Sequence, residues 1–373
     1  MKRPLGIAVA LAALAWSCGS SWNVAAPSSV SIGSGTQPAT VSADGAAGDP
    51  RNRGTQVWMN PPPAGDLIRA VQHPELWTEA QKRVDVFAVY FSQAYWHEGY
   101  ECGNACGPNG FTVLRDAGAF SWLGERFTLA LEAPAVKEWS CTPELLLSQA
   151  ALPAVHALDL VQQSGGTISY ISINESFAMG TSGYQGQAGP FGPSVTGCAL
   201  PPNEVAALLK LYVDTIHERY PAVRVGFIEP YPYFSADQIM SHLLELEHAS
   251  VPIPYFHLDM HLKGQVRRGE NAAADLRRIR EFCRARGISF GVIIFGEDGT
   301  SNAQFSADAW AVTQTVAAAV GVTEHTILQS WAEDPPGALN SVKHIPDIVP
   351  ESDPNSMSGL LLRILRYLKI EPR

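Results

Sequence analysis

Residues 167–175, TISYISINE, form a short apolar run that ends in a polar pair, Asn174 and Glu175. Such a run, preceded by two glycines, is typical of a buried strand that follows a turn. Seven other segments resemble it, at intervals of roughly 30 to 55 residues. They are residues 56–59, 84–91, 127–132, 223–229, 255–261, 289–297 and 326–331.

Helical signals lie between these runs. Asp66, Thr142 and Ser306 stand where helix N-caps are expected. Eight strand–helix pairs in strict alternation predict a parallel sheet with right-handed crossovers. For one domain over residues 55–373, the natural solution is a closed (β/α)8 TIM barrel, an α/β fold, and an open doubly wound sheet is the alternative. No GxGxxG pattern follows the first strand, which argues against a dinucleotide site.

The composition is that of an acidic globular protein. Hydrophobic residues make up 46% of the 373 residues and charged residues 17%, so a sizeable core is expected. Lysine and arginine number 26 against 36 acidic residues, which gives a formal net charge of −10. Because phosphates bind to basic surfaces, this charge argues against nucleic acid and against a polybasic membrane patch.

The first residues have the pattern of a targeting segment. Lys2 and Arg3 precede an apolar stretch, residues 5–16, that is too short to span a bilayer. We therefore predict a signal peptide over residues 1–21 and an exported protein. The residues before Cys18 resemble a bacterial lipobox, so secretion and a lipid anchor on Cys18 both stay open. Residues 22–54 are rich in Ser, Gly, Ala, Thr and Pro and are predicted to be a flexible linker.

Export permits disulfides. Cys102, Cys106, Cys141 and Cys198 follow predicted strands two to four, in loops that would share one rim of the barrel. We expect two disulfides among them, and three pairings are possible. Cys283 lies in a helical run and is predicted to be a buried free thiol.

Chemistry in such a barrel is expected at the carboxyl ends of the strands. Carboxylates end predicted strands three to seven, and crowding raises their pKa values, so that one can hold a proton while a neighbour stays ionised. Acid-assisted glycoside cleavage needs such a pair. The residues at these ends are Glu132, Asn174, Glu175, Glu229, His257, Asp259, His261, Glu297, Asp298 and Trp331.

Four of these residues carry a resemblance. Asn174 and Glu175 at the end of strand four, Glu297 at strand seven and Trp331 at strand eight resemble the clan A glycoside hydrolases, over residues 55 to 370. The resemblance implies that Glu175 is the acid/base, that Asn174 bonds the sugar 2-hydroxyl, that Glu297 is the nucleophile and that Trp331 floors the subsite. Phe295-Gly296-Glu297 reads as a strand end that runs into a turn, which could displace Glu297 outward.

A rival pattern lies on predicted strand six. Residues two apart on a strand face the same side, so His257, Asp259 and His261 could all point into the barrel. Two imidazoles and a carboxylate suit a metal ion. A row of substrate ligands or a hydrogen-bonded core row are the alternatives. Aromatic residues after the strands, Tyr231 and Trp139 among them, could stack on sugar rings or pack the loops.

The sequence therefore predicts an exported, monomeric glycoside hydrolase that needs no cofactor and acts on a polysaccharide or oligosaccharide. The predicted mechanism is double displacement through Glu175 and Glu297, with retention. Glu132, Glu229, Tyr231 and the three residues of strand six are predicted to contact substrate. The alternatives are a metal-dependent hydrolase built on His257, Asp259 and His261, and a barrel that binds surface glycans without catalysis.

Overall fold

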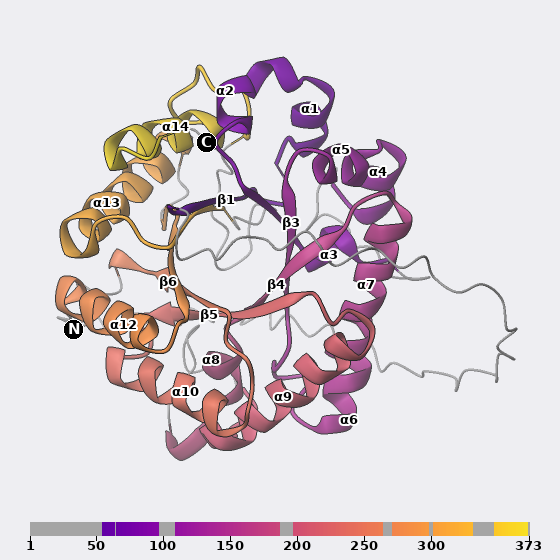
Figure 1. Cartoon of the computed structure of the whole chain (residues 1–373), viewed down its shortest axis with the longest axis vertical. Helices are drawn as coiled ribbons and strands as arrows, with labels where there is room; N and C mark the ends of the chain where they lie inside the picture. The colour runs from indigo at the N-terminus through magenta and orange to yellow at the C-terminus, as the bar shows by residue number, and fades with distance from the viewer. Residues whose placement is uncertain are drawn as a thin grey trace, which may run out of the picture. The chain divides into compact units, whose positions relative to one another are not determined.

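The computed structural model confirms the closed barrel. It describes residues 54–63, 65–96, 109–186, 197–263, 271–297, 301–330 and 347–371. Each strand pairs in parallel with the next, and the last pairs with the first. Figure 1 shows the ring of strands inside a ring of helices. The predicted signal peptide, linker and pair Cys102 and Cys106 lie outside the described residues.

The strands are β1 (Gln56–Asn60), β2 (Val86–Tyr90), β3 (Thr128–Ala133), β4 (Ile168–Asn174), β5 (Arg224–Tyr231), β6 (Tyr255–Met260), β7 (Ser289–Ile294) and β8 (His325–Gln329). The prediction placed the ends of the last two strands too late. The ladder between β7 and β8 ends at Ile294 and Leu328. Gly296 then passes against the backbone of Phe305, where an added Cβ would lie 2.5 Å from its atoms. This close approach turns the chain before Glu297.

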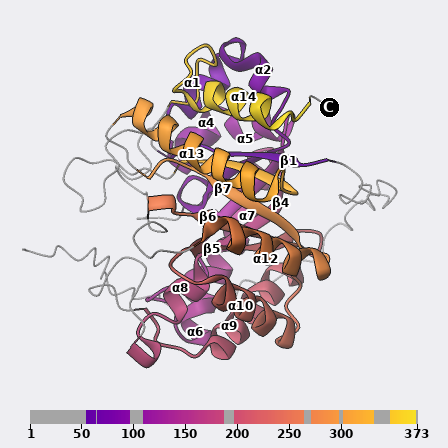
Figure 2. The same cartoon turned by 90° about the vertical axis from the view of Figure 1, so that its left-hand side faces the viewer.

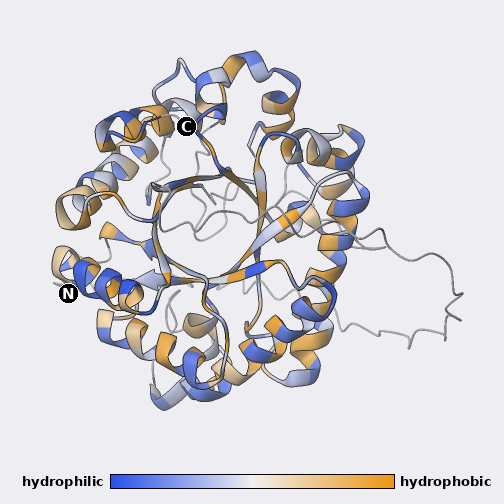
Figure 3. Cartoon of the chain, in the orientation of Figure 1, coloured by the Kyte–Doolittle hydropathy of each residue, from blue (hydrophilic) through white to orange (hydrophobic). Residues whose placement is uncertain are grey.

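The helices lie between the strands, and the side view in Figure 2 shows several of them alongside the barrel wall. Figure 3 shows hydrophilic and hydrophobic residues alternating along them, as expected of helices that cover a sheet. They are α1 (Leu67–Gln72), η2 (Pro74–Trp77), α2 (Thr78–Gln81), α3 (Phe91–Ala94), α4 (Phe111–Asp116), α5 (Ala119–Gly124), α6 (Pro143–Leu146), η4 (Leu147–Ala151), α7 (Leu152–Gln163), α8 (Ser176–Gly180), η5 (Tyr184–Gly186), α9 (Pro202–Arg219), α10 (Ala236–His248), α12 (Ala272–Ala285), α13 (Asn302–Val320) and α14 (Met357–Leu368).

The predicted caps are right at one position of three. Thr142 accepts a hydrogen bond from the backbone N–H of Leu145 and caps α6. Asp66 precedes α1 without capping it, because its carboxylate accepts from the backbone N–H of Ile348 instead. Helix α13 starts before Ser306, which is buried within it, and Ser301 is the cap.

A layer of rings fills the lower part of the barrel, and we call it the ring layer: Trp58, Tyr170, Tyr255, His257 and His325. The ring of Trp58 lies 4.9 Å from that of His257 and 5.1 Å from that of Tyr170. Two glycines make room for these rings. A Cβ on Gly226 would lie 2.3 Å from the Tyr255 ring, and one on Gly291 would lie 2.8 Å from both histidines. The barrel is therefore closed below its carboxyl-end mouth.

Candidate active site

The mouth of the barrel gathers buried acidic groups from four neighbouring strands. We call this set the carboxylate layer: Glu132 on β3, Glu175 after β4, Glu229 on β5 and Asp259 on β6, with the cations Lys137 and His261 beside them. All four carboxylates are less than 9% exposed. Sequence reasoning placed all four at strand ends, and the closed barrel brings them together.

Glu175 sits at the junction between β4 and α8. Its N–H donates to the carbonyl of Ile228 at 2.9 Å, which extends the pairing with β5 by one residue. Its backbone is left-handed, with φ 48° and ψ 40°. That conformation costs a residue with a side chain about 1–3 kcal/mol, and such residues cluster at active sites. The turn ends the strand at Asn174, and the Glu175 side chain lies over the barrel mouth.

Glu229 holds this turn in place. Its two carboxylate oxygens accept from the backbone N–H groups of Phe177 at 2.8 Å and Ala178 at 3.1 Å. Burial raises the pKa of Glu229 to about 8, although the two N–H donors favour its ionised form. Since both oxygens are engaged by backbone, Glu229 positions the start of α8. The structure thus uses Glu229 to hold the turn, whereas the sequence predicted a contact with substrate.

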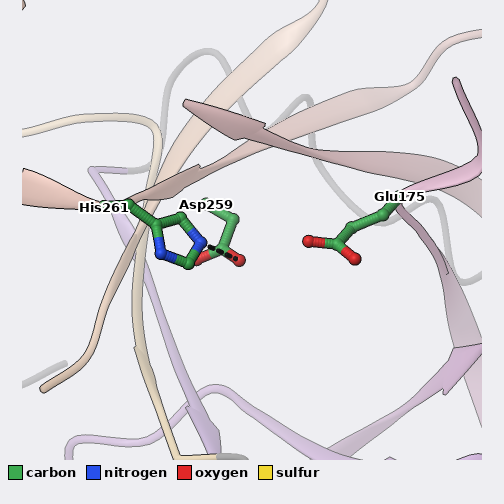
Figure 4. Close-up of side chains that lie close together, drawn as sticks. All are labelled: Glu175, Asp259 and His261. Atoms are coloured by element: carbon green, nitrogen blue, oxygen red, sulfur yellow. Dashed lines mark hydrogen bonds and ion pairs between the residues drawn. The ribbon is translucent and has the colours of Figure 1, made fainter. Parts of the chain in front are cut away.

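Glu175, Asp259 and His261 form the centre of the site. One oxygen of each carboxylate and one nitrogen of the imidazole all lie within 4.8 Å of one another. Figure 4 shows the Glu175 carboxylate directed across the mouth toward Asp259. His261 Nε2 lies 3.3 Å from Asp259 Oδ2. Alternate residues of β6 therefore do point inward, as the sequence predicted.

The charges around this centre shift its titrations. Burial raises the pKa of Glu175, and the negative charge of Asp259 adds to the rise, while Lys137 and His261 oppose it. For His261, burial favours the neutral ring, but the charges of Asp259, Glu175 and Glu297 outweigh it and raise the pKa to about 9. A carboxyl whose pKa is raised and an imidazole whose pKa is about 9 thus share one site.

Glu132 is the hub of an amide network. Its carboxylate accepts from Asn174 Nδ2 at 2.8 Å and from Asn60 Nδ2 and Gln329 Nε2, each at 2.7 Å. Burial raises the pKa of Glu132 to about 8, and the Asn174 bond opposes the rise. Lys137 Nζ donates to Asn174 Oδ1 at 3.0 Å. Asn174, the predicted 2-hydroxyl ligand, is therefore oriented from both ends of its amide.

Asn60, Lys137 and Gln329 are the site residues that sequence reasoning missed. Asn60 and Gln329 end β1 and β8, and that position was the available signal. Lys137 follows the end of β3 by four residues, in a loop without a recognisable motif. A disulfide between Cys141 and Cys198 ties the loop that carries Lys137 to the segment before α9, and Cys198 Sγ lies 3.2 Å from the Lys137 carbonyl oxygen. Cys283 is buried and free, as predicted.

Two predicted ligands lie elsewhere. His257 belongs to the ring layer, where its Nε2 lies 2.8 Å from His325 Nδ1. The predicted metal row therefore does not come together: the rise along the strand puts His257 a layer deeper than Asp259, and Glu175 takes its place in the cluster. The Tyr231 ring is fully buried and its hydroxyl donates to Asp275 of α12, so it offers no face to a sugar.

Glu297 follows β7 by three residues and is partly exposed. Its Oε1 accepts from the backbone N–H of Lys263 at 2.6 Å. It lies near enough for its charge to raise the pKa of His261. Trp331 and Asp298 lie outside the described residues.

A metal ion could be held by the central cluster. Two carboxylates and one imidazole suit Zn²⁺ or another divalent ion, and Glu175, Asp259 and His261 are the set of this kind among the described residues. The same three groups also suit proton transfer and nucleophilic attack, so the donor set by itself fits two chemistries.

No protein-family model matches the chain, and no curated protein does. A solved structure of a GH5_18 protein from Streptomyces cattleya in complex with Manb1-4GlcNAc has 10% identity and a TM-score of 0.52, over 85% of this chain and 82% of its own. A glucosidase from Croceicoccus marinus has 11% identity and a TM-score of 0.49, over 84% and 67%. An endo-beta-1,4-mannanase from Cellulomonas fimi has 14% identity and a TM-score of 0.43, over 77% and 68%. At 10% identity, the likeness to the Streptomyces cattleya structure shows a shared fold alone.

Proposed function

We propose that the chain is a glycoside hydrolase in which Glu175 is the acid/base. The observation that carries this is a buried carboxyl of raised pKa at the end of β4, with a second buried carboxylate oxygen within 4.8 Å. A general acid must hold its proton near neutral pH, and its partner must be ionised at short range. The fold shared with a GH5_18 barrel supports the same chemistry.

The proposed reaction retains the anomeric configuration. Carboxyl groups about 5–5.5 Å apart fit a nucleophile and an acid, whereas inversion needs about 6.5–9.5 Å to admit a water. The sequence resemblance gives the role of nucleophile to Glu297. Asn174, held by Lys137 and Glu132, presents its amide to the sugar 2-hydroxyl, and Trp331 supplies a stacking platform.

The substrate class we propose is a β-linked oligosaccharide or polysaccharide. The neighbour in complex with Manb1-4GlcNAc makes manno- and gluco-configured substrates the first to test. Export is part of the proposal, either as a secreted monomer or through a lipid on Cys18. Fractionation and intact-mass measurement of the expressed protein distinguish the two forms.

The test is Glu175→Gln against a panel of aryl β-glycosides and β-mannans. Loss of general acid catalysis lowers kcat/KM by about 10²–10⁴-fold for poor leaving groups, and the loss is smaller for dinitrophenyl glycosides, which depart without a proton. Glu204→Gln, on the exposed face of α9, is the matched control and keeps full activity. Undiminished hydrolysis by the Glu175 variant excludes the proposal. Glycan binding without turnover by the wild-type protein favours a non-catalytic barrel.

A metal-dependent hydrolase is the second candidate, because Glu175, Asp259 and His261 can converge on one ion. Dialysis against a chelator, followed by addition of Zn²⁺ or Mn²⁺, separates the two functions. Activity that a chelator abolishes and a divalent ion restores supports the metal enzyme. Activity that survives chelation, with the Glu175→Gln loss described above, supports the glycosidase.

A further inference from the structure

We infer that Asp259 on β6, and not Glu297 after β7, is the carboxylate that attacks the anomeric carbon. The inference rests on the proposed glycosidase function and assigns a second catalytic residue within it. It follows from three observations on the carboxylates around Glu175: their distance, their free oxygens and their burial.

Distance favours Asp259. An oxygen of Asp259 lies within 4.8 Å of one of Glu175, and Figure 4 shows the Glu175 carboxylate directed toward Asp259, which lies beside His261. A sugar ring placed between them would have the acid on one side of its glycosidic bond and the nucleophile on the other. This is the short spacing that double displacement uses. Glu297 does not belong to this cluster.

The free oxygens also favour Asp259. His261 Nε2 lies 3.3 Å from Asp259 Oδ2, and no donor among the described residues bonds Oδ1. A buried carboxylate oxygen without a hydrogen-bond partner is rare. Such an oxygen is available to react with a bound substrate. Glu297 offers no such buried oxygen: its Oε1 accepts from the backbone N–H of Lys263 at 2.6 Å, and the residue is partly exposed.

Burial separates the two in the same direction. Asp259 is 7% exposed and lies in the carboxylate layer with Glu132 and Glu175. A nucleophile in that place is sheltered from water, so an ester intermediate can form before hydrolysis. Glu297 is partly exposed and follows the turn after β7.

The step balances as follows. Asp259 Oδ1 forms a bond to the anomeric carbon while the bond from that carbon to the leaving oxygen breaks, and the leaving oxygen takes the proton of Glu175. A water then gives its proton to Glu175 and its oxygen to the anomeric carbon. The ester bond to Asp259 breaks, and both carboxyl groups regain their starting states.

The first experiment labels the wild-type protein. It is incubated with 2-deoxy-2-fluoro-β-glucosyl and β-mannosyl fluorides, which slow the second step, and the digested protein is mapped by mass spectrometry. The expected result is one sugar attached to Asp259. A sugar on Glu297 overturns the inference, and so does the absence of any label while aryl glycosides are hydrolysed.

The second experiment compares Asp259→Asn with Glu297→Gln, with circular dichroism and thermal melting to verify folding. We expect kcat/KM on dinitrophenyl glycosides to fall by about 10³-fold or more in the first variant and by less than about tenfold in the second. Asp259→Gly with added azide should yield a glycosyl azide of inverted configuration, because azide takes the vacated place. The reverse order of losses overturns the inference.

These experiments separate the inference from the function beneath it. If the wild-type protein hydrolyses glycosides and Glu175→Gln does not, the glycosidase stands whatever becomes of Asp259. If the wild-type protein neither hydrolyses nor is labelled by any probe, both are wrong.

Discussion

The ring layer and the carboxylate layer both draw on β4 and β6, and the chain along β6 supplies a histidine at each level, His257 within the strand and His261 just after it. His257 lies among rings, and burial, with His325 beside it, lowers its pKa well below the ordinary value. His261 lies beside Asp259 and has its pKa raised to about 9, although burial opposes that charge. The two histidines are only four residues apart in the sequence.

This difference shows that burial alone does not decide the charge of a group in this barrel. Desolvation acts on both histidines in the same direction, toward the neutral ring. Of the two, only His261 has a carboxylate in hydrogen-bond reach, and that carboxylate favours the charged ring. The ring layer is therefore a core that contains neutral histidines, while the carboxylate layer is a site that contains a charged one.

The largest expected effect comes from removing the centre of the ring layer. Trp58→Ala leaves a cavity below the site and should cost about 3–5 kcal/mol in the free energy of unfolding, measured with urea. Trp139→Ala is the matched control, because Trp139 is 40% exposed and its loss should change stability by less than about 0.5 kcal/mol. Equal costs for the two tryptophans would show that the ring layer is not a core.

The next effect concerns pH. Burial lowers the pKa of His325 to about 3 from 6.5, so the unfolded chain binds more protons than the fold in that window. The contribution of the neutral His325 to stability is complete above pH 6.5 and is lost as the pH falls toward 3. At pH 5 the loss in the free energy of unfolding is about 2 kcal/mol.

His325→Phe removes that titration, and its unfolding free energy should depend less on pH between 6.5 and 4 than that of the wild-type protein. Urea unfolding at several pH values measures the slope. Parallel curves for the two proteins would contradict the neutral state of the buried histidine.

A smaller effect is expected from the charged histidine. His261→Gln keeps a donor for Asp259 but removes the positive charge, and should lower kcat/KM by about tenfold, or 1.4 kcal/mol in transition-state stabilisation. Thermal stability should fall as well at neutral pH, because a pKa raised from 6.5 to about 9 means that the charged ring stabilises the fold. His248→Gln on exposed α10 serves as the control for both measurements. A loss of stability without a loss of activity would assign His261 to the core instead.

The smallest effect is a shift in the pH profile. The Lys137 charge favours the ionised form of Glu175, so Lys137→Met should raise the pKa of Glu175. The alkaline limb of kcat/KM, where the acid loses its proton, should then move to higher pH, with only a severalfold loss at the optimum. Lys210→Met, on exposed α9, should leave the profile in place. A shift to lower pH would contradict the assignment of Glu175 as the acid.

Alternation along the sequence was enough to predict the barrel and the placement of Glu132, Glu175, Glu229 and Asp259 at its mouth, because strand ends in a closed parallel sheet converge. It was not enough to predict how deep in the barrel each inward-facing side chain lies. His257 and Asp259 face the same side of β6, yet the rise along the strand sets them in different layers.

Contacts between distant residues also escaped sequence reasoning. The role of Glu229 depends on backbone N–H groups some fifty residues away, and Gln329 reaches Glu132 across 197 residues. No local pattern marks either contact. The end of β7 was misjudged because the stop comes from the contact of Gly296 with α13, which the local apolar run does not encode.

Because Glu175 has a left-handed backbone, selection for stability and selection for activity favour different residues at this position. Glycine and asparagine adopt that conformation at lower cost, so Glu175→Gly and Glu175→Asn should each melt at a higher temperature than the wild-type protein. Selection for stability alone would thus replace the proposed acid, and only selection for activity would keep it. In a library of variants of this chain that is selected for stability alone, glutamate at position 175 should therefore be replaced in the early rounds.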